Sequence, residues 1–222
     1  TVIDGQNEDC NVSLAGGIDS TTRISGFTIQ NGVGCVYGQG GGIYTENSSP
    51  KLDNLIIKNN TGGTFGGGMC LNGNSDAYLE NIIIENNSSE GGGGLYIYNS
   101  NPTIISCTIR DNYAYSGGGA YLTSSNPDME SITMHNNEAI QNGGAIFCGN
   151  GSNPSFRHFT IVNNSAEVGG AIYSDSNIEE SWEIILGDSY QKLENIFKKY
   201  IKEYLRYVVI LFFGLLHGLG FA

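Results

Sequence analysis

Short apolar and polar blocks alternate along this chain and return at a fixed interval. The apolar residue that follows each glycine cluster recurs every 25 or 26 residues, at Ile43, Met69, Leu95, Ala120, Ile146 and Ile172. A fixed period of this length is typical of a solenoid, in which each repeat is one structural unit stacked on the next. One coil therefore takes about 26 residues.

Three columns of apolar residues run through the copies of this repeat. Counting from the column of Pro50, Pro102, Pro127 and Pro154, the second position holds Leu52, Leu79, Ile104, Met129 and Phe156. The fifth position holds Leu55, Ile82, Cys107, Ile132 and Phe159, and the seventh holds Ile57, Ile84, Ile109, Met134 and Ile161. The same register reaches back to Ile24, Phe27 and Ile29, which makes a sixth, N-terminal copy. We expect these columns to be inward stacks.

The spacing within each copy predicts strands. Apolar fifth and seventh positions with a polar residue between them form the period-two pattern of a strand that buries one face. The copies are too short and too rich in glycine for helical repeats. We therefore predict an all-β, single-stranded parallel β-helix of about six coils over residues 1–177, with strands stacked at ~4.8 Å.

Asparagine and glycine mark the predicted corners. The second residue of each Asn-Asn or Asp-Asn pair forms a column of Asn60, Asn87, Asn112, Asn137 and Asn164. Asparagine tolerates a left-handed or bridge conformation, and its amide can bond an equivalent amide one coil away. We expect a corner ladder there. The glycine runs, such as 66–68 and 117–119, are expected where the chain must bend without Cβ crowding.

Composition narrows the range of partners. The chain has 22 acidic against 10 basic residues, a formal net charge of −12, so we expect no nucleic-acid partner. An anionic polymer is also repelled unless a divalent cation bridges it. The five cysteines lie 25 or more residues apart, without a metal-ligand spacing. We interpret most of them as buried apolar residues; a disulfide between neighbouring coils is the alternative in an oxidising compartment.

Several segments resemble a known family. Gly-Gly-Ala-Ile-Phe (143–147), Phe-Thr-Ile-Val-Asn-Asn-Ser-Ala (159–166) and Gly-Gly-Ala-Ile-Tyr (169–173) are similar to repeats of pectin-lyase-like right-handed β-helices. They look closest to repeats of chlamydial polymorphic outer-membrane proteins and related bacterial surface proteins. The resemblance covers about residues 1–177 and implies a right-handed coil and an extracellular, cell-surface or outer-membrane location.

The resemblance raises the question of catalysis, because carbohydrate-active β-helices use clustered carboxylates or Ca²⁺ held by acids. Asp53 and Glu80 occupy equivalent positions in adjacent coils, so they are the candidate catalytic pair, with Ca²⁺ as a cofactor if the protein is carbohydrate-active. An outward column of Lys58, Glu85, Arg110, His135 and Val162 alternates in charge at first. We interpret that column as a solvated ion-pair ladder.

The composition changes after Asn177. Residues 178–206 exchange glycine and asparagine for residues that favour helices, so we predict a helical linker. Residues 207–222 are apolar and follow a basic flank, which predicts a truncated transmembrane-type helix and association with a membrane. The last ten residues resemble the HupE/UreJ membrane family, which implies a nickel or cobalt role for His217. The alternative explanation is that this tail is a foreign piece, which does not belong to the same protein as the repeat.

Three function classes follow. The leading interpretation is a non-catalytic extracellular or cell-surface module for adhesion, glycan contact or spacing, with a glycan or a host or cell-surface partner. The alternative is a polysaccharide lyase or glycoside hydrolase of the pectin-lyase-like fold. A fragment of a metal permease is the third class, and it rests on the tail alone.

Overall fold

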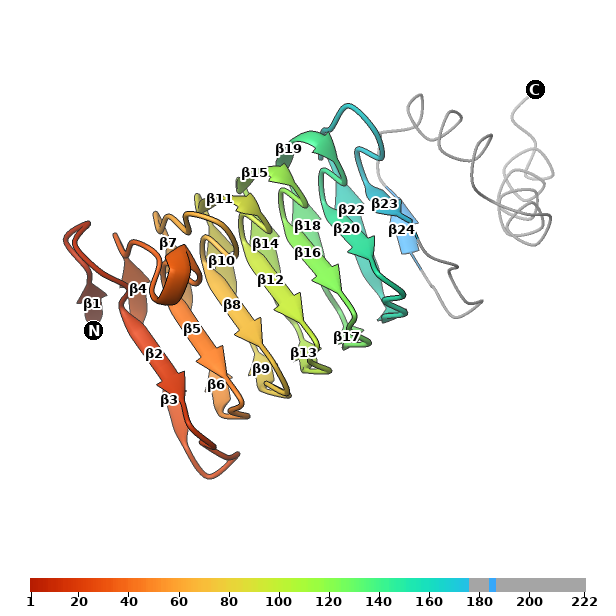
Figure 1. Ribbon diagram of the computed structural model, residues 1–222. Coiled ribbons are helices and arrows are strands. Elements are labelled where there is room, and N and C mark those ends of the chain that lie inside the picture. Colours follow the sequence, from red (N-terminus) through yellow and green to blue (C-terminus); the bar gives the residue numbers. More distant parts are fainter. Residues whose placement is uncertain (176–183, 187–222) are drawn as a thin grey trace, which may run out of the picture. The chain divides into compact units, whose positions relative to one another are not determined.

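The computed structural model describes residues 1–175 and 184–186, which form a parallel β-solenoid of about seven turns (Figure 1). The predicted all-β parallel solenoid is confirmed. It has one more turn than predicted, because the opening strand β1 (Val2–Asp4) pairs in register with β4 (Thr28–Gln30) and so belongs to a coil of its own. The coils follow one another from β1 at one end to β23 and β24 at the other.

Four parallel sheets run along the solenoid, and neighbouring strands of a sheet come from successive coils. Sheet A contains β1, β4, β7 (Ile56–Lys58), β10 (Ile83–Glu85), β14 (Thr108–Arg110), β18 (Thr133–His135), β22 (Phe159–Val162) and β24 (Ile184–Leu186). Sheet B contains β2 (Val12–Ala15), β5 (Ile43–Glu46), β8 (Met69–Asn72), β12 (Leu95–Tyr98), β16 (Ala120–Thr123), β20 (Ile146–Gly149) and β23 (Ile172–Ser174).

The other two sheets are shorter. Sheet C contains β3 (Arg23–Ser25), β6 (Lys51–Asp53), β9 (Tyr78–Glu80), β13 (Thr103–Ile105), β17 (Asp128–Glu130) and β21 (Ser155–Arg157). Sheet D contains β11 (Ser88–Gly91), β15 (Tyr113–Ser116) and β19 (Glu138–Asn142). One 3₁₀ turn, η1 (Val36–Gly38), lies before β5.

The core is a set of stacked columns of like side chains. Register places Ile57, Ile84 and Ile109 over one another in sheet A, and the same holds for the inward residues of sheets B and C. Every side chain of the second-, fifth- and seventh-position columns is 3% exposed or less. In the N-terminal copy, Ile29 is fully buried, whereas Ile24 and Phe27 are half-buried. Stacking identical apolar side chains at one strand spacing leaves little room for voids.

The corner geometry corrects one prediction. The left-handed residue is the first member of each pair: Asn59, Asn86, Asp111, Asn136 and Asn163 have φ between 53° and 56°. The second member, which was expected to occupy that conformation, does not. The positive φ turns the chain, so the first side chain faces solvent while the second is carried into the wall. A further left-handed corner, at Asn54, Asn81, Ser106, Ser131 and His158, was not predicted.

Glycine is required where coils approach each other most closely. A Cβ built on Gly118 would lie 2.4 Å from the carbonyl oxygen of Glu138, in the next coil. No side chain fits at such a distance, so the second glycine of each cluster reflects backbone-to-backbone contact rather than chain bending alone.

The structure corrects part of the predicted tail. Within the expected helical linker 178–206, residues 184–186 are described, and they form strand β24, which pairs with β22. The sequence Ile-Ile-Leu suits a strand because β-branched apolar residues favour extended backbone. The rest of that linker, the transmembrane-type segment 207–222 and His217 lie outside the described residues. In the part of the chain that the structure describes, no helix is long and apolar enough to cross a membrane.

Candidate functional site

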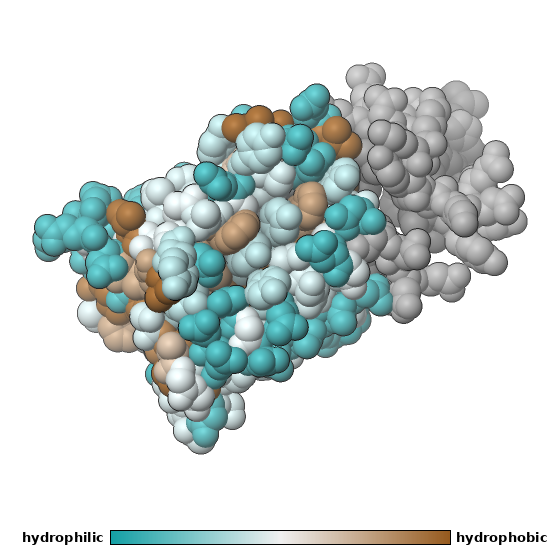
Figure 2. Space-filling model, in the orientation of Figure 1, coloured by the Kyte–Doolittle hydropathy of each residue, from teal (hydrophilic) through white to brown (hydrophobic). Residues whose placement is uncertain are grey.

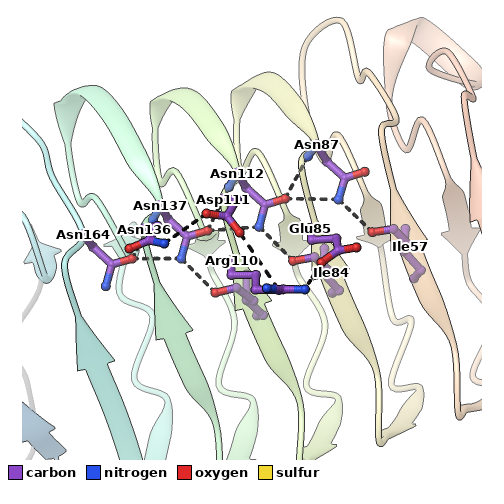
Figure 3. Close-up of polar contacts among 11 residues, drawn as sticks. Ile57, Ile84, Glu85, Asn87, Arg110, Asp111, Asn112, Asn136, Asn137 and Asn164 are labelled. Atoms are coloured by element: carbon purple, nitrogen blue, oxygen red, sulfur yellow. Dashed lines mark hydrogen bonds and ion pairs between the residues drawn. The ribbon is translucent and has the colours of Figure 1, made fainter.

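The second asparagines of the corner pairs form a ladder inside the solenoid wall (Figure 3). Each is 5% exposed or less. In Asn87, Asn112, Asn137 and Asn164 the amide oxygen accepts two bonds from the asparagine of the preceding coil, whereas the Asn60 oxygen accepts from the Gly32 backbone N–H and from Asn11 Nδ2. The Asn112 oxygen, for example, accepts the Asn87 backbone N–H at 3.0 Å and its Nδ2 at 3.1 Å. Asn112 Nδ2 in turn donates to Asn137 Oδ1 and to the carbonyl of Ile84, both at 3.0 Å. One side chain therefore joins three coils.

A second ladder of serines runs along another corner, and sequence reasoning missed it. Its members are buried and lie two residues before the proline column: Ser48, Ser75, Ser100, Ser125 and Ser152. The Ser75 backbone N–H donates to Ser100 Oγ at 3.0 Å, and that hydroxyl donates to the Tyr98 carbonyl at 2.9 Å. The recurring Ser-x-Pro spacing was the available signal.

Asp53, one of the two candidate catalytic residues, is held in an ion pair. Arg23 Nε and Nη2 donate to its two oxygens at 2.6 and 2.7 Å, and Ser25 and Asn54 donate at 2.8 and 2.5 Å. The carboxylate is 2% exposed. The hydrogen bonds from Arg23 outweigh desolvation and hold the pKa of Asp53 well below its usual range. These contacts leave Asp53 an ionised structural anchor for the corner between two coils.

Glu80, the other candidate, lies one coil away and faces solvent. Register places it next to Asp53 in sheet C, but its carboxylate pairs with Lys51 Nζ at 3.7 Å. General acid–base work by two carboxylates needs both of them open to a substrate. The pair is adjacent, as the sequence indicated, yet each carboxylate has its own basic partner.

The outward charge column contains a real ion pair in its middle. Arg110 Nη2 contacts Glu85 Oε2, and Arg110 Nε lies 4.0 Å from Asp111 Oδ2 (Figure 3). Lys58 precedes Glu85 in register, and His135 and Val162 follow Arg110. The arrangement is that of charges placed one strand spacing apart on a solvated face, worth a few tenths of a kcal/mol per pair.

Two of the five cysteines form a disulfide between neighbouring coils. Cys10 bonds to Cys35, 25 residues later, with their Cα atoms 4.8 Å apart. Cys70, Cys107 and Cys148 are buried free thiols. Burial raises their pKa, to about 12 for Cys107, so they remain protonated and unreactive. The structure thus has both of the arrangements considered for these residues.

An aromatic column runs along the outward face of sheet B. Register aligns Tyr44, Cys70, Tyr96, Tyr121, Phe147 and Tyr173. Successive rings lie close: the Tyr121 and Phe147 centroids are 4.2 Å apart and the Phe147 and Tyr173 centroids 5.1 Å, both stacked. Stacking along the axis covers the faces of the rings, so Tyr96 and Phe147 are buried and Tyr121 and Tyr173 are half-buried.

A groove follows this column toward sheet D. It has a volume of about 390 Å³ and is lined by aromatic, amide, hydroxyl and acidic side chains: Phe65, Glu90, Tyr115, Ser116, Tyr121, Gln141, Asn142, Phe147 and Tyr173, with Gly91. Tyr115 is 50% exposed and supplies a free ring on the sheet D side. Lining residues come from five successive coils. Four strand spacings of ~4.8 Å give the groove a length of ~19 Å.

Sequence reasoning did not single out the groove residues. The position after the inward residue of each glycine cluster is aromatic in five of the six copies from Tyr44 to Tyr173, and that recurrence was the available signal. In the described ranges 1–175 and 184–186, no group of three or more His, Cys, Asp or Glu could hold a metal ion.

Comparison with known proteins identifies the repeat. The profile of a family described as the right handed beta helix region matches residues 9–181, which is more than half of the chain. No curated protein and no solved structure matches. The matched range contains both ladders, the disulfide and the groove.

Proposed function

The chain belongs to the right-handed β-helix family, and from this premise we propose that it is a non-catalytic extracellular module that binds a glycan along the groove beside sheet B. The observation that carries the proposal is the lining of that groove. Residues of five coils line it, and they combine half-buried aromatic rings, the exposed ring of Tyr115 and the amides of Gln141 and Asn142. Sugars offer hydroxyl groups to amides and tyrosine hydroxyls, and apolar C–H faces to an aromatic ring.

The distribution of acids favours binding over cleavage. Among the described residues that line the groove, Glu90 is the one carboxylate. Hydrolysis of a glycosidic bond ordinarily uses two carboxylates flanking that bond. Asp53 and Glu80 belong to sheet C, away from the groove lining, and each has a basic partner. A polysaccharide lyase or hydrolase remains the competing proposal, and an activity assay separates it from ours.

Charge favours an uncharged glycan. Residues 1–175 contain 16 Asp or Glu and five Lys or Arg, so this part of the chain carries a formal charge of 5 − 16 = −11. A polyanion such as a uronate polymer meets a repulsive field along such a surface. Figure 2 shows hydrophobic residues as small separate patches among hydrophilic ones on the face drawn, which is ordinary for a protein surface.

The disulfide supports an extracellular location. Disulfides persist in oxidising compartments and are rare in the reducing cytosol. Cys10 and Cys35 bridge two coils of the matched β-helix region, and this bond supports placing the module in an oxidising environment. The specific setting proposed, a bacterial surface or outer membrane, comes from the resemblance of the glycine-rich repeats to bacterial surface proteins.

The test is retention of the full chain on immobilised neutral and uronate polysaccharides. We expect retention on at least one neutral glycan, and a loss of tenfold or more in affinity for Tyr115→Ala and for Gln141→Ala. Tyr98→Ala is the matched control, because Tyr98 is also an exposed tyrosine, at 44%, but does not line the groove.

Two outcomes contradict the proposal. Retention on uronate polymers with none on neutral ones would reverse the assignment of ligand charge. Release of reducing ends from any retained polysaccharide, lost in the Asp53→Asn and Glu80→Gln double variant, would establish the enzyme instead.

A further inference from the structure

The aromatic column is covered at its N-terminal end by extra chain. Between the left-handed corner and the next strand of sheet B, the stretch from Asn31 to Ile43 spans 12 residues, whereas the stretch from Asn86 to Leu95 spans nine. The additional residues include η1 (Val36–Gly38). Beneath this segment Tyr44 is 2% exposed and Cys70 fully buried, although both belong to the outward column.

The covering segment is fixed in three ways. Cys35, which lies within this segment, forms the disulfide with Cys10. The Thr64 hydroxyl donates to the Tyr37 carbonyl at 2.8 Å, and the Thr64 backbone N–H donates to the Gly38 carbonyl at 3.1 Å. Cys70 Sγ lies 3.7 Å from Gln39 Oε1. The segment is thus tied to the coil before it and to the coil after it.

Phe65 completes the closure. Its ring stacks on Tyr96 with centroids 4.3 Å apart and lies over Gly91, where a Cβ would come within 2.7 Å of Phe65 Cδ1. Gly91 is therefore the residue that admits the ring. Phe65 occupies the coil in which the outward column has Cys70 instead of an aromatic residue, and it is the first residue of the groove lining.

We infer that the groove ends at Phe65 and receives the terminus of a linear neutral glycan rather than an internal stretch. This inference rests on the proposed function and adds a specificity-determining residue to it. A chain lying along the groove meets the edge of Phe65, backed by the disulfide-tied segment, and has no path past Tyr44. An internal stretch would need an open channel on both sides of the contact.

The experiment measures how much protein a glucan binds at saturation. The probes are linear β-1,3-, β-1,4- and α-1,4-glucans, each prepared in two chain lengths that differ tenfold and compared at equal mass. Recognition of chain ends predicts that the short preparation binds about ten times more protein, because it has ten times more ends. Equal binding by mass would overturn the inference and leave glycan binding intact.

Variants test the role of the stop. Phe65→Ala should open the groove toward Tyr44 and raise the amount of protein bound to the long glucan at least severalfold. Tyr98→Ala is the control, and it should leave the amount bound to both the long and the short glucan unchanged. The Cys10→Ser and Cys35→Ser double variant, which frees the covering segment, should shift binding in the same direction. Unchanged stoichiometry in both variants, with folding intact by circular dichroism, contradicts the inference. If no neutral polysaccharide is retained, these glucans included, both the inference and the proposed function are wrong.

Discussion

At the scale of the residue, the asparagine ladder concentrates much of the polar bonding of the wall in five side chains. Each amide satisfies backbone groups that would otherwise be buried without partners. Buried polar groups cost far more when a partner is removed than they contribute as a pair. The ladder is consequently sensitive to truncation in a way that the outward charge column is not.

Replacing one ladder residue should measure this sensitivity. In Asn112→Ala the Asn87 backbone N–H and Nδ2 both lose their acceptor in the interior, so we expect the free energy of unfolding to fall by about 2–5 kcal/mol. Urea denaturation measures the change. Asn136→Gly is the control: Asn136 is exposed with φ 56°, which glycine adopts freely, and a change within about 0.5 kcal/mol is expected.

Asp53 gives a prediction about pH. Its pKa is lowered in the folded protein, so its ion pair contributes stability fully above the unfolded pKa of ~3.9, and that stability is lost as pH falls through the folded value. Unfolding free energies of the wild type and of Asp53→Asn, taken from pH 6 down to pH 2, should therefore converge below about pH 4. Parallel curves over this range would mean that Asp53 does not titrate anomalously.

Residues also show what the sequence could and could not reveal. Burial of the apolar columns follows from a period of two, which is local and readable. The choice of the left-handed member of each Asn pair depends on which side chain the turned backbone carries inward, and composition does not encode it. His158 occupies a left-handed corner, although histidine is not a typical turn-forming residue. The Arg23–Asp53 pairing joins positions 30 residues apart and needed the register of sheet C.

At the scale of the element, the glycine clusters are contact points between coils. Gly118→Ala should destabilise the protein by about 1–3 kcal/mol or prevent folding, because its Cβ would meet the Glu138 carbonyl in the next coil. Gly63→Ala is the matched control, since the nearest atoms to a Cβ there lie at 3.5 Å. Thermal denaturation of the two variants compares them, and equal melting temperatures would contradict the role assigned to Gly118.

The disulfide is an element-scale tie with its own prediction. Replacing Cys10 and Cys35 by serine opens a loop of 25 residues, and the chain-entropy model gives a loss of about 3.5 kcal/mol. The same loss should appear when the wild type is unfolded in the presence of a reductant. The buried thiol Cys148 provides the control. The difference in unfolding free energy between the wild type and Cys148→Ser should be the same with and without reductant, because Cys148 takes no part in the disulfide.

The groove was the part of the molecule that the sequence revealed least. Its aromatic column could have been recognised from spacing alone. Its other wall, with Tyr115 and Gln141, comes from sheet D, where a register shift in β19 interrupts the repeat. Phe65 belongs to none of the apolar columns read from the sequence; it stands in register with Gly91 of sheet D, and its ring fits because Gly91 has no side chain and position 70 is a cysteine. Such compensation between coils is a property of the packed structure.

At the scale of the whole molecule, coils are interchangeable units that contact only their neighbours. Deleting residues 101–125 joins Ser100 to Asn126 and should preserve both ladders, because each residue removed has an equivalent in the next coil. We expect a folded protein with unchanged far-ultraviolet circular dichroism per residue. Deleting residues 101–112 removes half a coil, so that strand β12 of sheet B leads directly into strand β15 of sheet D. This deletion should abolish cooperative unfolding in urea.

The sense of the asparagine ladder has a consequence for how the solenoid grows. Four of the ladder residues donate their backbone N–H and their amide to the asparagine oxygen of the following coil: Asn60, Asn87, Asn112 and Asn137. In a stack that forms from its N-terminal end, the next asparagine therefore supplies one oxygen that accepts both of these bonds at once. Folding of the solenoid therefore has a direction, because each formed coil offers the donors to which the next coil binds.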